Sequence, residues 1–117
     1  MMYMLLIYAT EAEWTAFSDA EQAAVMDDHL RLESDLRSAG KYKGCGALQL
    51  TSTATTVRVR GGKTLITDGP FAETKEQFGG YYLVEAKDLD DALSIAARIP
   101  TARNGSIEVR PLAQIKQ

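Results

Sequence analysis

The chain has 117 residues, 45% hydrophobic and 25% charged, which is ordinary for a globular protein with one modest core. Its net charge of −3, without a basic patch, argues against direct nucleic-acid binding. The longest apolar run, residues 1–9, is too short to span a membrane and lacks the features of a signal peptide. Cys45 is the only cysteine, so no intrachain disulfide can form. We therefore expect one domain over residues 1–117, in the reducing cytoplasm and without a membrane partner.

The first part of the chain predicts a strand followed by a long helix. Residues 2–8, MYMLLIY, are almost continuously apolar, which is typical of a strand buried on both faces. Ser18 and Glu21 have the spacing of a capping box, and Gly40 can end the helix in a left-handed conformation. Between them, apolar residues recur at helical spacing, at Val25, Leu32, Leu36 and Ala39.

The middle of the chain predicts β structure. A strand with a glycine-rich start is expected over residues 44–50. Residues 55–60 alternate apolar and charged side chains, and Gly61-Gly62 separates them from a second run at residues 63–67. Two such runs around a glycine pair are a strong hairpin signal.

The remaining elements complete a recognisable order. We expect a strand over residues 80–86, a helix from Asp88 to about Ile99, and a last strand over residues 106–109. The resulting order, β-α-β-β(β)-β-α-β, indicates an α+β, ferredoxin-like sandwich with an added β-hairpin. Its two helices can cover only one face of the antiparallel sheet. We therefore expect a homodimer in which two sheets cover each other, a dimeric α+β barrel.

The stretch TDGPFAETKEQFGGYY, residues 67–82, places several charged side chains between two strand-like runs. Asp68 begins a turn signal, Asp-Gly-Pro, so a structural role for its carboxylate is the simpler interpretation. Glu73 and Lys75 are most simply a solvated surface. In the functional interpretation they form a mixed-charge lip for a small polar ligand, in which Lys75 receives an anionic group and Glu73 assists proton transfer.

Three segments resemble the YCII-related family, and specifically its DGPF branch. These segments are MYMLLIY, the run from TTVRVRGGK through DGPFAETKEQFGGYY to DLDDAL, and IPTARNGSIEVRPL. The resemblance covers nearly the whole chain and implies a ferredoxin-like fold and a dimeric α+β barrel. The family's activity is largely undefined. Some members are encoded beside, or fused to, extracytoplasmic-function sigma factors, which implies a regulatory role as an alternative to catalysis.

His29 is the only histidine, and it falls on the apolar stripe of the first predicted helix. Its imidazole is suited to proton transfer near neutral pH, whereas a core histidine bonded to a backbone carbonyl is the simpler alternative. Shorter YCII-related proteins have a histidine at this position, proposed to form a catalytic dyad with an aspartate before a proline. Here Ile99 precedes Pro100, so that aspartate is missing. We therefore expect Asp68, at a strand end, to be the carboxylate partner of His29.

Tyrosines supply further candidate ligand-binding groups. Tyr8 ends the first strand, where its hydroxyl can reach a pocket mouth. Tyr81 and Tyr82 alternate across their strand, so one of them faces the helices, with core or interface packing as the simpler role. A metal site is not expected, because one histidine and Cys45 give no repeated ligand spacing. The pair Gly61-Gly62 lacks the pattern of a phosphate-binding loop, so no cofactor is expected either.

The sequence leaves two functions open, and a dimeric scaffold without a small ligand is the simpler alternative to both. The first is a small cofactor-free enzyme with a His-centred acid/base pocket for a small polar organic substrate. The second is a non-catalytic ligand-binding or regulatory module associated with an extracytoplasmic-function sigma factor. The candidate residues are His29 and Asp68 for catalysis, and Tyr8, Glu73, Lys75 and Tyr82 for ligand binding.

Overall fold

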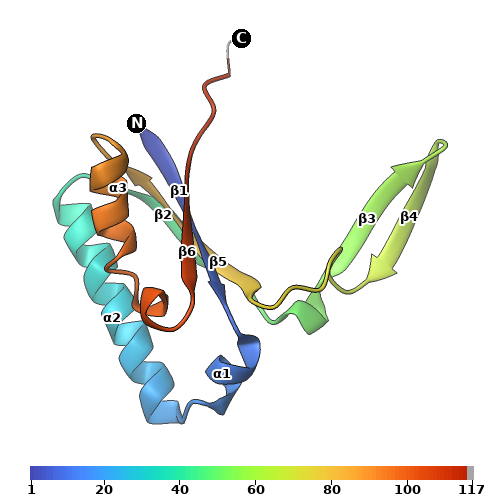
Figure 1. Ribbon diagram of the computed structural model, residues 1–117, viewed down its shortest axis with the longest axis horizontal. Coiled ribbons are helices and arrows are strands. Elements are labelled where there is room, and N and C mark those ends of the chain that lie inside the picture. Colours follow the sequence, from blue (N-terminus) through green and yellow to red (C-terminus); the bar gives the residue numbers. More distant parts are fainter. Residues whose placement is uncertain (116–117) are drawn as a thin grey trace.

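The computed structural model describes residues 1–115 as a body and a projecting two-stranded arm (Figure 1). The elements are β1 (Met2–Ala9), α1 (Glu11–Ala16), α2 (Asp19–Ser38), β2 (Tyr42–Ala47), η1 (Thr51–Thr53), β3 (Thr55–Arg60), β4 (Lys63–Asp68), β5 (Gln77–Glu85), α3 (Leu89–Ala96), η2 (Pro100–Arg103) and β6 (Ser106–Pro111). The predicted α+β, ferredoxin-like architecture is confirmed. Within the described residues, no helix is long and apolar enough to cross a bilayer.

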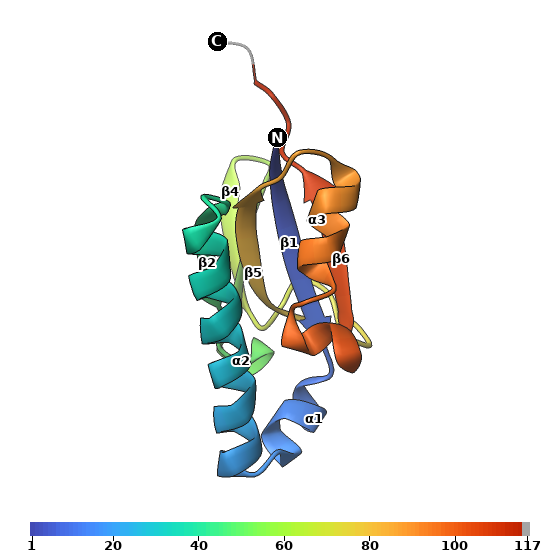
Figure 2. The same ribbon diagram turned by 90° about the vertical axis from the view of Figure 1, so that its left-hand side faces the viewer.

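The body is a four-stranded antiparallel sheet in the order β2-β5-β1-β6. Figure 2 shows α2 and α3 side by side across one face of this sheet. The buried core lies between these helices and the sheet. Its members are Tyr3, Leu5, Leu32, Leu36, Tyr82, Val84, Ala86, Ala92, Ile95, Ala96 and Ile99.

β1 shows how the core depends on alternation along a strand. Tyr3 and Leu5 point to the helices and are buried, whereas Met4 and Leu6 lie on the opposite face and are only half-buried. The continuous apolar run therefore does not produce a strand buried on both faces within one chain. Within residues 1–115, no helix covers the face that carries Met4 and Leu6 (Figure 1).

The capping box predicted at the start of the long helix is confirmed. The Ser18 hydroxyl accepts a hydrogen bond from the backbone N–H of Glu21 at 3.1 Å, and the Glu21 carboxylate accepts one from the backbone N–H of Ser18 at 2.9 Å. The preceding short helix, α1, was not predicted. It has only six residues and no side-chain cap, so neither periodicity nor capping marks it in the sequence.

Several element boundaries differ from the predicted ones. β2 begins at Tyr42 and ends at Ala47, earlier than the expected strand over residues 44–50. β5 begins at Gln77 rather than residue 80, because Gly79 and Gly80 continue the strand instead of ending the loop. Gly80 permits this, since a side chain there would lie 2.8 Å from the Gly46 carbonyl oxygen on the neighbouring strand. α3 ends at Ala96, before the expected Ile99.

The arm is the predicted hairpin, β3 paired with β4 in a separate two-stranded sheet. Gly61 and Gly62 form its turn with φ of 56° and 75°, values that side-chain-bearing residues rarely adopt. Hydrogen bonds hold the base of the arm. The backbone N–H of Gly69 donates to the Ala54 carbonyl, and the Thr56 hydroxyl donates to the Gly69 carbonyl, both at 2.8 Å.

Candidate functional site

A pocket of about 610 Å³ lies among α1, the N-terminal half of α2, the β2–β5 side of the sheet and the connection that follows β2. This volume is in the range of sites for small organic molecules. Its walls are mainly apolar, with contributions from Ile7, Trp14, Phe17, Val25, Met26 and Leu48. Polar side chains present less surface to the pocket, and they include Glu11, His29, Gln49, Gln77, Tyr82 and Asn104.

His29 and Tyr82 form the central contact of this pocket. His29 is carried by α2 and lies on the face that also carries the buried Leu32, as its helical spacing predicts. Its Nδ1 lies 2.7 Å from the Tyr82 hydroxyl oxygen, within hydrogen-bond distance. The two rings are nearly parallel, with an interplanar angle of 14° and centroids 5.9 Å apart.

The strand register explains why Tyr82, and not Tyr81, meets His29. Tyr82 pairs with Leu5 of β1 and Cys45 of β2, which places all three side chains on the helix-facing side of the sheet. Tyr82 is accordingly only 3% exposed. Tyr81 lies on the other face and packs against Gly46, where an added Cβ would lie 2.8 Å from the tyrosine ring.

The protonation states follow from burial. Burial lowers the pKa of His29, an effect that the negative charge of Asp28 partly opposes. Burial also raises the pKa of Tyr82, and the nearby Cys45 and Glu33 add to this rise. Near neutral pH the pair is therefore an uncharged imidazole next to a protonated phenol.

Cys45 also lines the pocket, beside Tyr82. Its Sγ accepts a hydrogen bond from the Tyr42 hydroxyl at 3.2 Å, and this bond raises the pKa of Tyr42. The Arg37 guanidinium lies 4.2 Å from the centre of the Tyr42 ring, a cation–π contact. Cys45 is nevertheless exposed, so its thiol is hydrogen-bonded to Tyr42 and also open to solvent.

The structure does not bring Asp68 to His29 within one chain. Asp68 ends β4 opposite Thr55, is exposed on the arm, and is not among the residues that line the pocket. Within the described residues, the side-chain hydrogen-bond partner of His29 is Tyr82. A His29–Asp68 pairing between two copies of the chain stays a prediction.

The other predicted ligand-binding residues also lie apart from His29. Tyr8 packs against Phe78, with tilted rings whose centroids are 5.4 Å apart, and does not line the pocket. Glu73 lines a second hollow of about 360 Å³ near the base of the arm. Lys75 is exposed and lines neither hollow. Of the six candidate residues, only His29 and Tyr82 therefore meet in one site.

Sequence reasoning missed the aromatic wall of the pocket. Trp14 lies in α1, and its ring centroid is 5.9 Å from that of Phe17. The three-residue spacing of Trp14 and Phe17 was the signal in the sequence that could have indicated this wall, because residues three apart share one face of a helix. Glu11 ties α1 to the connection after β2, since its carboxylate accepts hydrogen bonds from the Thr51 N–H and hydroxyl, each at 2.7 Å.

No group of three or more histidine, cysteine, aspartate or glutamate side chains is placed to hold a metal ion anywhere in residues 1–115.

Comparisons with known proteins agree with the family resemblance. The sequence matches the YCII-related domain family over residues 1–116. It is also similar to the uncharacterised protein R00369 of Rhizobium meliloti (strain 1021), with 42% identity over 118 residues. That match covers 99% of this chain and 95% of the relative. The chain therefore belongs to the YCII-related family.

Proposed function

We propose that this protein is a small cofactor-free enzyme in which His29 transfers a proton to or from an organic substrate. The observation that carries the proposal is the hydrogen bond between His29 and Tyr82 in a pocket of suitable size. Histidine is the side chain whose ordinary pKa best suits proton transfer near neutral pH. A pocket that combines such a group with apolar walls is the usual form of a small-molecule site.

Tyr82 orients the imidazole. It engages Nδ1, and among the described residues Nε2 has no hydrogen-bond partner. Nε2 is therefore the ring nitrogen available to a ligand in the pocket. Because burial keeps the ring neutral, the direction of transfer depends on the tautomer. With Tyr82 donating to Nδ1, Nε2 carries the hydrogen and binds a substrate oxygen; with Nδ1 donating to Tyr82, Nε2 accepts a proton from the substrate.

The pocket walls narrow the class of substrate. The aromatic side chains of Trp14 and Phe17, with Val25 and Met26, suit an apolar or ring-shaped molecular body. One or two polar atoms near His29 would then fix the orientation of the substrate. A carbonyl compound with an acidic C–H bond fits both requirements, because removal of that proton is a reaction for a neutral imidazole.

Proton exchange with solvent tests the proposal without knowledge of the complete reaction. A panel of aryl-substituted ketones, 2-oxo acids and lactones is incubated with the protein in D₂O, and loss of the α-hydrogen signal is followed by NMR. We expect exchange of at least one compound that is lost in His29→Asn and reduced in Tyr82→Phe. Lys75→Ala is the matched control, since Lys75 lines neither hollow, and should exchange at the wild-type rate.

The same panel tests the alternative of a non-catalytic module. Binding that shifts the His29 ring signals without any exchange would contradict catalysis and support a ligand-binding or sigma-factor-associated regulatory role. Neither exchange nor binding across the panel would contradict the substrate class.

A further inference from the structure

The arm has an apolar face that nothing in the described chain covers. Cross-strand partners share a face, so the pair Val57 and Ile66 lies on the same side of the arm as Val59. These three side chains are 60%, 69% and 59% exposed. The other face carries Arg58, opposite Leu65, and the remaining basic residues. An isolated two-stranded hairpin is marginally stable in water, so a hairpin of this kind needs a surface to pack on.

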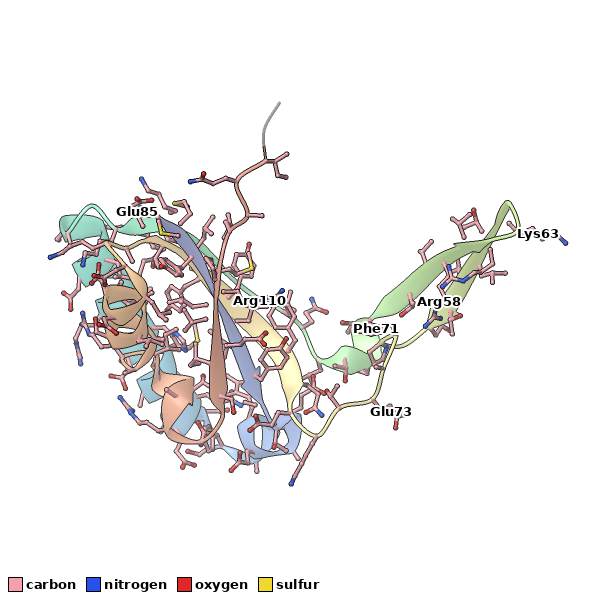
Figure 3. The ribbon with its side chains drawn as sticks, turned by 45° about the horizontal axis from the view of Figure 1, so that its top comes forward. Arg58, Lys63, Phe71, Glu73, Glu85 and Arg110 are labelled. Atoms are coloured by element: carbon pink, nitrogen blue, oxygen red, sulfur yellow. The ribbon has the colours of Figure 1, made fainter. Side chains whose placement is uncertain are left out.

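Hydrogen bonds close the base of the arm and join the turn before it to α1. Backbone and side-chain hydrogen bonds close the arm between Ala54 and Gly69, and Glu11 fixes the preceding turn at Thr51. Figure 3 places Phe71 at the base of the arm, Arg58 along it and Lys63 at its tip. Phe71 is itself 79% exposed.

The arm projects on the side of the sheet opposite α2 and α3, which is also the side of the open sheet face (Figure 1). That face carries the half-buried Met4, Leu6, Tyr81 and Leu83. Two apolar surfaces, the open sheet face and the arm, are thus left uncovered on the same side of the molecule.

We propose that the β3–β4 arm clasps a second copy of this chain. Val57, Val59 and Ile66 pack on the body of that copy, and the open sheet faces of the two copies meet. In a dimer with two-fold symmetry all of these surfaces are covered at once. Each copy supplies a sheet face and an arm, and it is contacted by the sheet face and the arm of its partner. The proposal is independent of the catalytic role of His29.

The area of the uncovered surfaces fits a second copy that is held by both the open sheet face and the arm. With eight residues in β1 and four strands, the sheet face measures about 26 by 19 Å, on the order of 500 Å². A stable interface buries roughly 800 Å² on each partner. The arm, with six residues in each strand, adds on the order of 200 Å² per face. Sheet and arm together therefore approach the required area, whereas the sheet alone does not.

The charges favour contact between the arm of one copy and the body of the other over contact between the two arms. Between Thr55 and Asp68 lie three basic residues and one acidic residue, a net charge of +2, whereas the whole chain carries −3. The three basic side chains lie on the face opposite Val57, Val59 and Ile66, so they act at long range: two arms repel each other, and an arm is attracted to the acidic body of another copy.

Neighbouring arm residues provide a matched test. Ile66→Thr removes apolar surface from the proposed contact face, and Leu65→Thr makes a similar change on the opposite face. Each dimer contains the substitution twice. We expect sedimentation velocity over a dilution series to show a wild-type dimer and a dissociation constant raised about 10-fold by Ile66→Thr and about 100-fold by Val57→Thr/Ile66→Thr. Leu65→Thr should stay within about three-fold of wild type.

The body should fold normally in all of these variants, because the substituted side chains are exposed and lie outside the core. Unchanged His29 ring signals verify this. A wild-type protein that stays monomeric at high concentration would overturn the proposal. So would a dimer that ignores Val57→Thr/Ile66→Thr, or one that Leu65→Thr weakens as much as Ile66→Thr.

Discussion

Removing the Tyr82 hydroxyl is the most specific perturbation of the site, because it changes a single hydrogen-bonding group. Tyr82→Phe keeps the ring in the core but deletes the partner that lies 2.7 Å from His29 Nδ1. The phenol is 3% exposed, so water does not readily replace its oxygen, whereas His29 is only half-buried and can recruit water. A hydrogen bond of this kind contributes about 1 kcal/mol net, and an unsatisfied buried partner raises the cost to at most about 3 kcal/mol.

We therefore expect Tyr82→Phe to lower the free energy of unfolding by about 1 kcal/mol, measured by urea denaturation at pH 7.5. The ¹⁵N shifts of the His29 ring should change at the same time, because Nδ1 loses the group that selects its tautomer. Tyr8→Phe is the control, since Tyr8 packs against Phe78 and does not line the pocket. An unchanged His29 spectrum in Tyr82→Phe would refute the hydrogen bond. Equal spectral changes in both variants would refute its assignment to Tyr82.

The remaining predictions concern His29, the glycine contacts and the helix cap. Because burial lowers the pKa of His29, NMR titration should give a value below the ordinary 6.5 that Asp68→Asn does not change; a value above 6.5 that falls in the mutant would instead support pairing between copies. The unfolded chain then takes up the proton first, so stability should fall as pH drops through about 6.5, and this slope should flatten in His29→Asn. Gly80→Ala should cost about 1–3 kcal/mol by thermal unfolding because its Cβ would meet the Gly46 carbonyl, whereas Gly79→Ala, with open space, should cost less. Ser18→Ala should lower the free energy of unfolding by about 1 kcal/mol through loss of the capping box; an unchanged value would show that the cap is dispensable.

Much of the fold could be predicted from local patterns. The capping box at Ser18, the glycine pair that turns the arm, and the order of strands and helices are short-range features, so neighbouring residues determine them. The position of His29 on the buried face of α2 belongs to the same class, because helical periodicity alone sets it. Short or weakly patterned segments were harder: α1 is too short to show a period, and Gly79 and Gly80 suggested a loop where β5 continues.

The partner of His29 depended on tertiary structure. Tyr82 lies 53 residues away in the sequence, and it reaches His29 because strand register places it on the helix-facing side of β5. Asp68 has chemistry that suits a dyad, but the arm carries it away from the pocket of its own chain. Sequence patterns thus identified the residue capable of proton transfer, since this depends on side-chain type and helical phase. Only the packing of α2 on the sheet decided which group bonds to it, because contacts between distant segments are set by register and topology.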